Sequence, residues 1–461
     1  MKTFDVAVIG AGPGGFDAAL GARELGFSVA LIDKSDLGGT CLNTGCIPTK
    51  SLLASTKFLT RMKHAEVFGL STVFPVWDIS SLIQRKNRIV DSLKKAMTET
   101  LNRSGVEWVS GEASFTGKGR LQIVPAVEIE SKYVIIATGS VPLAFPGTPF
   151  DGERILSSAD LLEIKTPPRD LLILGGGVVG VEFASIFQAL GVRVTIVEML
   201  ERLLAGEDPE LGRRLESLYQ RKGVQVLTGE KVQNLAVQTN GVEALLESGK
   251  KLTADHVLVA TGRRPRVENL GLEKAGIKFN KKGIEVNEYL ETSAPNIFAI
   301  GDVTNRTTGL AHGATAEGIR VAENLKGPPK KMNYEAIPNC IYSDPEVASV
   351  GIYRSGRGSE EIVECKILFS SIGKSQVEGE TEGFLKMAAS KKTGKILGVA
   401  GIGAHVTELI HEAVLAIKAG LTVQTLAETI HAHPTESEIL QKAAQKLAVM
   451  TAVKRCAVIP K

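Results

Sequence analysis

The sequence predicts an α/β fold with two parallel-sheet domains, one inserted in the other, followed by a C-terminal α+β domain. Three observations support this prediction. A strand–glycine loop–helix–strand pattern occurs twice, an apolar strand ending in Ala-Thr-Gly also occurs twice, and the chain from about residue 334 onward has a different pattern with no glycine fingerprint. The expected boundaries are 1–143 and 263–333 for the interrupted first domain, 144–262 for the inserted domain and 334–461 for the last.

Composition limits the class of protein. The chain has 461 residues, 43% hydrophobic and 23% charged, which is typical of a globular protein with two to four domains. A net charge of +3 gives no reason to expect nucleic acid or an anionic membrane as a partner. No run approaches the roughly 18 apolar residues of a membrane span. The first strand follows Met1 closely, so we expect no signal or transit peptide and a cytoplasmic protein.

The first glycine loop follows the apolar strand Phe4–Ile9 and opens a helix, and the unit ends with an acid after its second strand. This order is typical of a Rossmann-like dinucleotide site. Gly10 would allow the tight turn, Gly12 the approach of a pyrophosphate and Gly15 the packing of helix on strand. Asp33 would accept hydrogen bonds from a ribose.

The second glycine loop repeats this arrangement with Gly175, Gly177 and Gly180, and Glu198 takes the place of the acid. In each copy the first glycine stands 23 residues before the acid. A glutamate here would repel a 2′-phosphate, which favours NAD over NADP at this site. Arg202, four residues later, leaves NADP open.

The two Ala-Thr-Gly strands end at Gly139 and Gly262, and they mark the points where the chain passes between the two dinucleotide domains. A further apolar strand ends at Asp302. Ligands in such sheets bind beyond the carboxyl ends of the strands, so Asp302 is a candidate ligand. The alternative is an ordinary turn residue.

Two cysteines, Cys41 and Cys46, lie just past the first dinucleotide unit. Residues five apart in a helix have Cα atoms about 8–9 Å apart, whereas a disulfide needs about 4.4–6.8 Å. Closing so short a loop would stabilise the fold by only about 2 kcal/mol. A bridge here is therefore a poor staple but a reasonable strained, reducible pair, and Gly45 eases the distortion. The alternatives are two structural thiols or half of a metal site; no second Cys/His cluster has fitting spacing, so we expect no metal.

The position of the cysteines indicates the order of the cofactors. A flavin can mediate between hydride and thiols, and the pair follows the first glycine loop. We therefore expect FAD at the first site and NAD at the second.

The last part of the chain, from about 334, contains no glycine fingerprint. Short strands alternate with turns, and two amphipathic helices are predicted over 407–419 and 435–450. This part is expected to form a separate α+β domain, either for association or as a compact appendage.

Two motifs carry a family resemblance. The run Gly38–Lys50, which reads GGTCLNTGCIPTK, and the run Ile430–Glu438, which reads IHAHPTESE, closely resemble signatures of the pyridine nucleotide–disulfide oxidoreductases. The first is most similar to that of the members that oxidise dihydrolipoamide. The resemblance covers essentially the whole chain and implies a homodimer whose last domain is the dimerisation domain.

The resemblance implies roles for further residues. His433 would be the general base and Glu438 would orient it, both reaching the active site from the partner subunit. His431 competes for the role of base. Lys50 would lie near the reactive edge of the flavin, paired with Glu182.

The expected contacts of the two cofactors can be stated together. Those of FAD are Gly10, Gly12, Gly15, Asp33, Lys50, Gly139, Asp302 and Ala311, and those of NAD are Gly175, Gly177, Gly180, Glu198 and Gly262.

The implied activity is oxidation of dihydrolipoamide, carried on lipoyl domains of 2-oxo acid dehydrogenase or glycine cleavage complexes. Cys41 would exchange with the substrate, and Cys46 would face the flavin as a thiolate. The alternative enzyme is an NAD(P)H-dependent reductase of the glutathione or mercuric type, although the tail has a single cysteine, Cys456, where mercuric relatives carry a pair. A different class is a structural docking subunit, against which the intact Cys41, Cys46, His433 and Glu438 argue.

Overall fold

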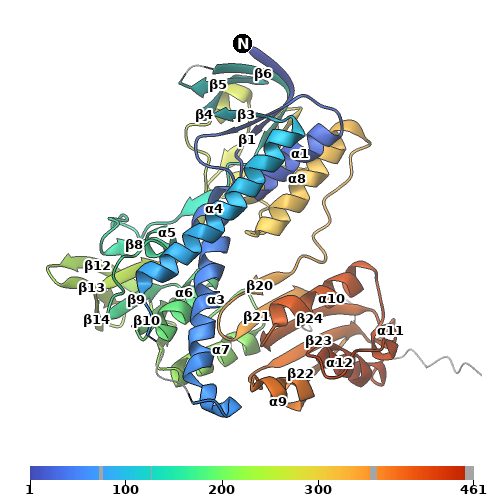
Figure 1. Cartoon of the computed structure of the whole chain (residues 1–461). Coiled ribbons are helices and arrows are strands. Elements are labelled where there is room, and N and C mark those ends of the chain that lie inside the picture. Colours follow the sequence, from blue (N-terminus) through green and yellow to red (C-terminus); the bar gives the residue numbers. More distant parts are fainter. Residues whose placement is uncertain (72–75, 126, 353–360, 452–461) are drawn as a thin grey trace, which may run out of the picture. The chain divides into compact units, whose positions relative to one another are not determined.

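The structure is a computed structural model, which describes residues 1–71, 76–125, 127–352 and 361–451 (Figure 1). The chain forms two compact units, each of which collects separate stretches of sequence. Unit 1 consists of Met1–Leu52, Trp77–Pro167 and Val259–Met332, and unit 2 of Leu53–Val76, Pro168–Leu258 and Asn333–Lys461. Cys456 and the segment 353–360 lie outside the described residues.

Unit 1 is built on a mixed sheet. Its strand order is β3(Glu107–Ser110), β2(Val29–Asp33), β1(Lys2–Ile9), β6(Val127–Ile136), β5(Arg120–Val124) and β4(Glu112–Gly117), with β19(Ile297–Ala299) paired to β6. The pairs among β3, β2, β1, β6 and β19 are parallel, whereas β5 pairs antiparallel with both β4 and β6. The parallel strands therefore end at one edge of the sheet.

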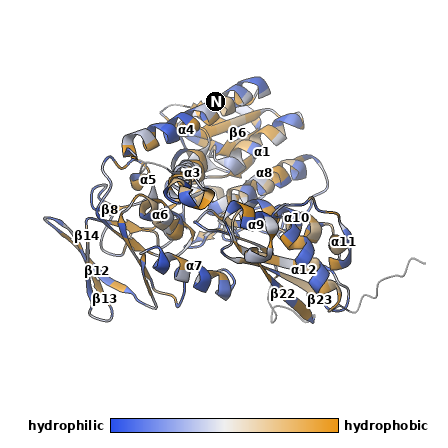
Figure 2. Ribbon diagram, turned by 60° about the horizontal axis from the view of Figure 1, so that its bottom comes forward, coloured by the Kyte–Doolittle hydropathy of each residue, from blue (hydrophilic) through white to orange (hydrophobic). Residues whose placement is uncertain are grey.

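The central strand β1 is apolar on both faces because both faces are covered. Val6 and Val8 belong to a core shared with α1(Pro13–Glu24) and α8(Ala311–Lys326), which lie side by side in Figure 1. Ala7 and Ile9 belong to a second core, formed with β4, β5 and the short helix η2(Leu272–Ala275). Figure 2 shows the hydrophobic residues along β6, the neighbour of β1.

The remaining elements of unit 1 are short, apart from one long helix. They are α2(Gly39–Thr44), α4(Ile79–Ser104), β7(Ser140–Pro142), β8(Ile155–Leu156), α5(Ser158–Leu161), β16(Arg263–Pro265), β17(Phe279–Asn280), β18(Gly283–Ile284) and η3(Gly301–Val303). The helix α3(Cys46–Lys63) begins in unit 1 and ends in unit 2.

Unit 2 contains a second parallel arrangement. Its strands follow the order β11(Gln225–Thr228), β10(Arg193–Glu198), β9(Asp170–Leu174) and β15(His256–Val259), accompanied by α6(Val178–Ala189) and α7(Pro209–Arg221). The antiparallel strands β12(Val232–Gln238), β13(Gly241–Leu246) and β14(Lys251–Ala254) follow, and η1(Ala65–Phe68) also belongs to this unit.

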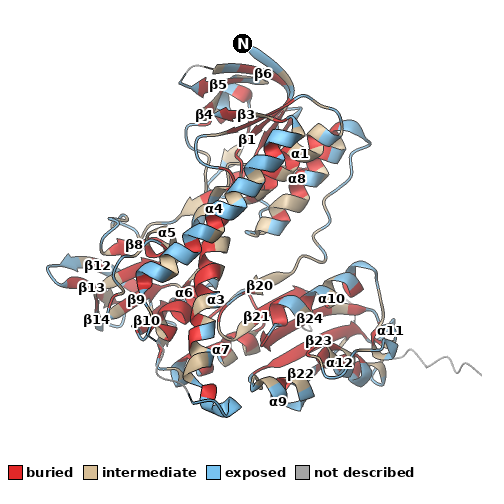
Figure 3. Ribbon diagram, viewed as in Figure 1, coloured by how far each residue is buried: buried red, intermediate tan, exposed pale blue. Residues whose placement is uncertain are grey.

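The C-terminal part of unit 2 is an antiparallel sheet covered by helices. The strand order is β20(Asn339–Ile341), β21(Glu346–Gly351), β24(Ile396–Gly403), β23(Phe384–Ser390) and β22(Ile362–Leu368). The helical elements are η4(Phe369–Ser371), α9(Gly373–Glu378), α10(Val406–Lys418), α11(Val423–Glu428) and α12(Glu438–Ala448). Strands β23 and β24 are almost wholly buried (Figure 3), and they share one core with α10, α11 and α12.

These observations confirm the predicted fold class. The two helices predicted over 407–419 and 435–450 correspond to α10 and α12, and a third helix that was not predicted, α11, lies between them. The second predicted helix begins only at Glu438, and α11 begins at Val423, directly after Thr422, whose hydroxyl caps the helix by accepting from the Thr425 amide. Six residues are too few for a helical period to stand out in sequence.

Two findings bear on the class of protein. Over the described residues, no helix is long and apolar enough to cross a membrane. The same part of the chain contains no group of three or more His, Cys, Asp or Glu side chains that could hold a metal ion.

Candidate active site

The first glycine loop is shaped by contacts that exclude side chains. Gly10 has φ +106°, and a Cβ at Gly15 would lie 1.9 Å from the Gly10 carbonyl oxygen. At Gly12, by contrast, a Cβ would meet no atom within 4 Å. Gly12 caps the N-terminus of α1. The loop therefore keeps open space at a helix N-terminus, which is the arrangement that receives a pyrophosphate.

The acid after β2 is held against this loop. The Asp33 carboxylate accepts from the Ala11 amide at 2.7 Å through Oδ2 and from the Ser35 amide at 2.9 Å through Oδ1. Each oxygen keeps a second lone pair. Asp33 is thus fixed at the end of its strand and can still accept from a ribose hydroxyl.

The helix that carries Cys41 rests on the same loop. Gly38 and Gly39 have φ +93° and +55°, and a Cβ at Gly39 would lie 2.7 Å from the Gly12 Cα. The Gly38 amide donates to the Ala11 carbonyl at 2.9 Å. The two glycines before Cys41 are therefore needed for the close approach of α2 to the dinucleotide loop.

Cys41 and Cys46 occupy two helices rather than one. Cys41 lies in α2, Gly45 ends that helix with φ −140° and ψ −110°, and Cys46 begins α3. Both cysteines are thiols in the structure and both are half-buried. The helix break solves the spacing problem that the sequence posed, because it brings the two thiols within hydrogen-bonding distance.

The pKa of Cys41 is raised far above its ordinary value. The main cause is its hydrogen bond to the side chain of Cys46, and burial adds to it, whereas the nearby charge of Lys50 acts in the opposite direction. The hydrogen bond and the burial both favour the protonated form of Cys41. Cys46 is also the first residue of an 18-residue helix, where the helix dipole stabilises negative charge.

Asp302 lies in a hydrogen-bonded chain that the sequence analysis missed. Arg263 Nε donates to Ser140 Oγ at 2.8 Å, and Ser140 Oγ donates to Asp302 Oδ2 at 2.6 Å. Thr307 donates to the other oxygen of Asp302 at 3.1 Å. Burial lowers the pKa of Arg263, while the charges of Asp302 and Cys46 oppose this shift. Gly139 and Gly262 directly precede Ser140 and Arg263, so the repeated Ala-Thr-Gly signal could have found this pair.

Ala311 begins α8, and this helix N-terminus is also tied to the strand end before Asp302. The buried Glu317 of α8 accepts from the Gly301 amide at 2.6 Å. Gly139 has φ +69°, and a Cβ there would meet no atom within 4 Å. A second helix N-terminus and a second open glycine therefore belong to unit 1.

The second glycine loop repeats the first in unit 2. A Cβ at Gly180 would lie 1.9 Å from the Gly175 carbonyl oxygen, whereas a Cβ at Gly177 would meet nothing within 4 Å. Glu198 accepts from the Gly176 amide at 2.6 Å and from the Leu200 amide at 2.8 Å. These contacts match those of Asp33 almost bond for bond.

Arg202 is turned back onto its own loop. Its guanidinium donates to the Ala205 carbonyl at 2.8 Å, and its Cδ lies 3.6 Å from the Cβ position of Gly212 in α7.

Glu182 is buried in α6, where its Oε1 accepts from the Tyr342 amide at 3.0 Å. The next residues of the 342–344 segment are held to the same helix, because the Asp344 amide donates to Ser185 at 3.0 Å. Glu182 therefore contacts a segment far from it in sequence.

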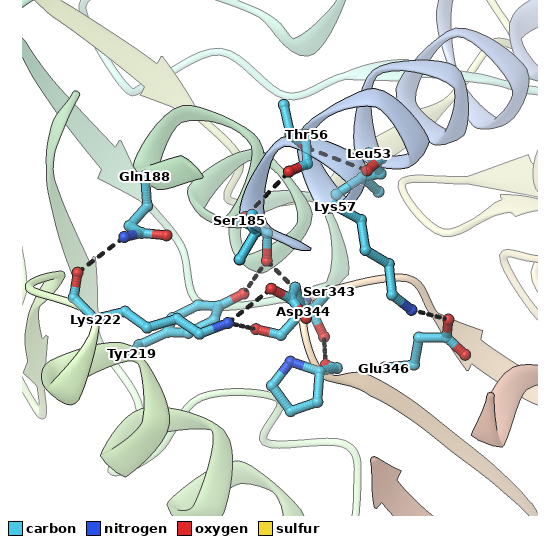
Figure 4. Close-up of polar contacts among 12 residues, drawn as sticks. Leu53, Thr56, Lys57, Ser185, Gln188, Tyr219, Lys222, Ser343, Asp344 and Glu346 are labelled. Carbon is cyan, nitrogen blue, oxygen red and sulfur yellow. Dashed lines mark hydrogen bonds and ion pairs between the residues drawn. The ribbon is translucent and has the colours of Figure 1, made fainter. Parts of the chain in front are cut away.

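A buried network fixes this contact (Figure 4). Tyr219 of α7 donates to the Val181 carbonyl at 2.6 Å and lies 2.7 Å from Ser185 Oγ. Since Val181 can only accept, the Ser185 hydroxyl must donate to Tyr219. Lys222 donates to the Asp344 carbonyl at 2.9 Å and to its carboxylate at 2.7 Å.

His433 and Glu438 form a pair at the start of α12. His433 Nδ1 lies 3.0 Å from Glu438 Oε1, and the Thr435 amide donates to Glu438 Oε2 at 3.0 Å. The hydrogen bond to His433 is the main reason why the pKa of Glu438 is lowered. The His433 side chain is 76% exposed. A carboxylate on Nδ1 fixes the tautomer that leaves Nε2 able to take a proton.

The competing histidine is differently placed. His431 uses Nε2 on Glu412 and Nδ1 on the Thr429 carbonyl, both at 3.0 Å, and its side chain is only 5% exposed. Its two ring nitrogens are engaged, whereas His433 is open to a ligand.

The structure thus gathers the predicted residues into groups. Within unit 1 it brings the cysteine pair to the first glycine loop, and it places Gly262 in this unit. Within unit 2 it fixes the second loop, Glu182 and the His433–Glu438 pair. The two open glycine cradles at helix N-termini fit two dinucleotides.

Comparisons with known proteins agree with this arrangement. Residues 4–318 match the family model described as pyridine nucleotide-disulphide oxidoreductase, and residues 337–444 match its dimerisation domain. The chain belongs to this family. It is accordingly a flavoprotein disulfide oxidoreductase, from a family that binds FAD and NAD(P), and its dimerisation domain supports a homodimer.

Curated relatives extend over nearly the whole chain. A dihydrolipoyl dehydrogenase from Bacillus subtilis is 40% identical over 450 residues, covering 95% of this chain and 97% of that protein. One from Chlamydia trachomatis is 38% identical over 451 residues, covering 96% of each.

Solved structures show the same fold. LpdA from Mycobacterium tuberculosis has a TM-score of 0.90 at 26% identity, covering 97% of this chain and 100% of that one. The HOCl-induced flavoprotein disulfide reductase RclA from Escherichia coli has a TM-score of 0.86 at 29% identity, covering 96% and 99%.

Proposed function

We propose that this protein oxidises protein-bound dihydrolipoamide to lipoamide through a Cys41–Cys46 disulfide and FAD, with NAD as the electron acceptor. The observation that carries the proposal is the close approach of α2 to the first glycine loop, where Gly39 meets Gly12. It places a pair of thiols at a dinucleotide cradle. The choice of substrate is supported by the relatives named dihydrolipoyl dehydrogenase.

FAD would supply the transfer of electrons between thiols and a nicotinamide. The residues that would hold it are Gly10, Gly12, Gly15, Asp33, Lys50, Gly139, Asp302 and Ala311. Their backbone amides and the N-termini of α1 and α8 favour the negative pyrophosphate.

The thiol chemistry balances within the cysteine pair. One substrate thiolate attacks Cys41 of the oxidised pair, forming a mixed disulfide and releasing Cys46 as a thiolate. The second substrate sulfur then displaces Cys41, so that lipoamide leaves as a disulfide. The substrate loses two electrons and two protons; the cysteine pair takes up both electrons and one proton, on Cys41, and His433 takes the other proton.

The base for this exchange is His433, which takes a proton from the substrate thiol on Nε2. Glu438 holds the ring and stabilises the imidazolium. We place this pair beside Cys41 of the partner subunit, so that each active site needs both chains of a homodimer.

The second site is proposed for NAD rather than NADP, with contacts from Gly175, Gly177, Gly180, Glu198 and Gly262. The support is the Glu198 carboxylate and the turned-back Arg202. Glu182 would pair with Lys50, as in the family signature that both residues resemble.

The physiological substrate is proposed to be a lipoyl domain of a 2-oxo acid dehydrogenase or glycine cleavage complex, and the compartment the cytoplasm. The test is a steady-state assay of NAD reduction by dihydrolipoamide, run beside NADPH oxidation by glutathione disulfide. We expect turnover only in the first. Turnover with glutathione disulfide but not with dihydrolipoamide would replace the proposal with a glutathione-type reductase.

A further inference from the structure

Glu436 lies between His433 and Glu438 in sequence, but its side chain points the other way. It is 8% exposed, whereas the His433 side chain is 76% exposed. The Ser375 hydroxyl, itself buried in α9, donates to Glu436 Oε2 at 2.7 Å. The other oxygen, Oε1, is buried and has no hydrogen-bond partner among the described residues.

The charged groups around Glu436 do not neutralise it. Lys374 of α9 pairs with Glu378 at 2.7 Å, and Glu380 after α9 lies 3.7 Å from Arg61. His405, before α10, is exposed, and the carboxylate of Glu438 is directed to His433. No ion pair within the described ranges includes Glu436.

A buried carboxylate with one unpaired oxygen and no counter-ion is costly, so the neutral acid is favoured. Burial raises the pKa of Glu436, with the charge of Glu380 in support. The hydrogen bond from Ser375 and the charges of His405 and Lys374 act in the opposite direction.

The helix α9, which bonds to Glu436 through Ser375, also lies beside His433. The Cβ position of Gly373, the first residue of α9, lies 3.8 Å from His433 Cε1. The Glu436 carbonyl accepts from the Ile439 amide at 3.1 Å, which places Glu436 in the turn that opens α12. One short helix therefore bonds to Glu436 and lies beside His433.

We propose that Glu436 is a positioning residue for the His433–Glu438 pair, acting as a neutral carboxylic acid that pins the loop 433–437 to α9. The inference rests on the proposed function only for the role given to His433. It adds a third side chain to the pair, one that acts through the loop and touches no substrate.

The test compares Glu436→Gln, which mimics the neutral acid, with Glu436→Ala, in the FAD-loaded protein. Thermal unfolding would be followed from pH 4.0 to 8.5, with the exposed Glu364→Gln as a matched control. A raised folded pKa contributes stability at low pH that is lost as pH rises. We therefore expect Glu436→Gln to match the wild type at pH 4.0, below the ordinary pKa of a glutamate, and to exceed its unfolding temperature by about 2–4 °C once the pH has risen past the raised pKa of Glu436. Glu436→Ala should unfold lower at every pH, and the control should stay parallel to the wild type.

A second measurement reads the histidine directly. The pH dependence of His433 modification by diethyl pyrocarbonate, followed by mass spectrometry, reports its protonation. We expect Glu436→Gln to keep the wild-type midpoint and Glu436→Ala and Ser375→Ala to shift it. Parallel wild-type and Gln unfolding curves, or equal losses in Gln and Ala at pH 7, would overturn the proposal. Neither measurement uses dihydrolipoamide, so a failed substrate assay leaves both interpretable.

Discussion

At the scale of single residues, the two cysteines differ in what surrounds them. A hydrogen bond to Cys46 raises the pKa of Cys41, and Cys46 begins a long helix. We predict that Cys46→Ser abolishes NAD reduction. It should also abolish the long-wavelength absorbance that is expected when the two-electron-reduced enzyme holds a thiolate against FAD. Cys41→Ser is the control, because it should also lose turnover yet keep a thiolate at Cys46 and its absorbance. If this absorbance survived in Cys46→Ser, the assignment of the thiolate to Cys46 would be wrong.

The histidine pair gives a second prediction. His433→Gln should lower kcat by about 10²–10⁴-fold, the usual range for a general base, and Glu438→Gln should lower it less. The dissociation constant for NAD, measured by calorimetry, should stay the same in both variants. His431→Gln is the comparison, and a larger loss of kcat there than in His433→Gln would exchange the two roles.

The stability of the fold in acid also depends on the contact between His433 and Glu438. Because His433 and the Thr435 amide lower the pKa of Glu438, the carboxylate persists as pH falls past the ordinary value for a glutamate. Its contribution to stability is present above that value and is lost only as pH falls through the lowered pKa.

At the scale of elements, the junction of α6, α7 and the 342–344 segment depends on one buried hydroxyl. Burial raises the pKa of Tyr219 far above its ordinary value, so it remains a donor to Val181. We predict that Tyr219→Phe lowers the free energy of unfolding by about 1–3 kcal/mol, since Ser185 loses its buried partner. Amide exchange in the peptide containing Asp344 should also become faster.

The matched control is Tyr133→Phe, which removes a hydroxyl from a half-buried tyrosine in unit 1. Hydrogen exchange by mass spectrometry and urea unfolding measure both effects. Equal changes in the two variants would show that the hydroxyl of Tyr219 does not specifically stabilise the junction of α6, α7 and the 342–344 segment.

The same scale shows what sequence could predict. Each glycine loop was predictable because its parts are local: the turn, the close approach and the capping acid all fall within 23 residues. The Arg263–Ser140–Asp302 chain was not, because its members are 123 and 162 residues apart and only the fold pairs them. The inward turn of Glu436 was hidden for the same reason, since its partner Ser375 lies 61 residues away.

At the scale of the whole molecule, the proposed active site needs two chains. The cysteine pair lies in unit 1 and the His433–Glu438 pair in the dimerisation domain. A substitution can therefore remove either half of the proposed active site from a chain and leave the other half intact. We predict that Cys46→Ser and His433→Gln subunits, inactive as homodimers, recover activity when they are co-expressed. In a mixed dimer, the chain with intact cysteines meets the intact histidine of its partner at one of two sites.

Random assembly makes half of the dimers mixed, and each mixed dimer has one intact site. The mixture should therefore show about a quarter of the wild-type activity per FAD, as isologous symmetry requires. The measurement is NAD reduction by dihydrolipoamide after purification through two different affinity tags, which isolates the mixed dimer. The purified mixed dimer should have about half of the wild-type rate, because one of its two sites is intact. If the site lay within one chain, both sites of the mixed dimer would lack one component, and the purified mixed dimer would be as inactive as its parents.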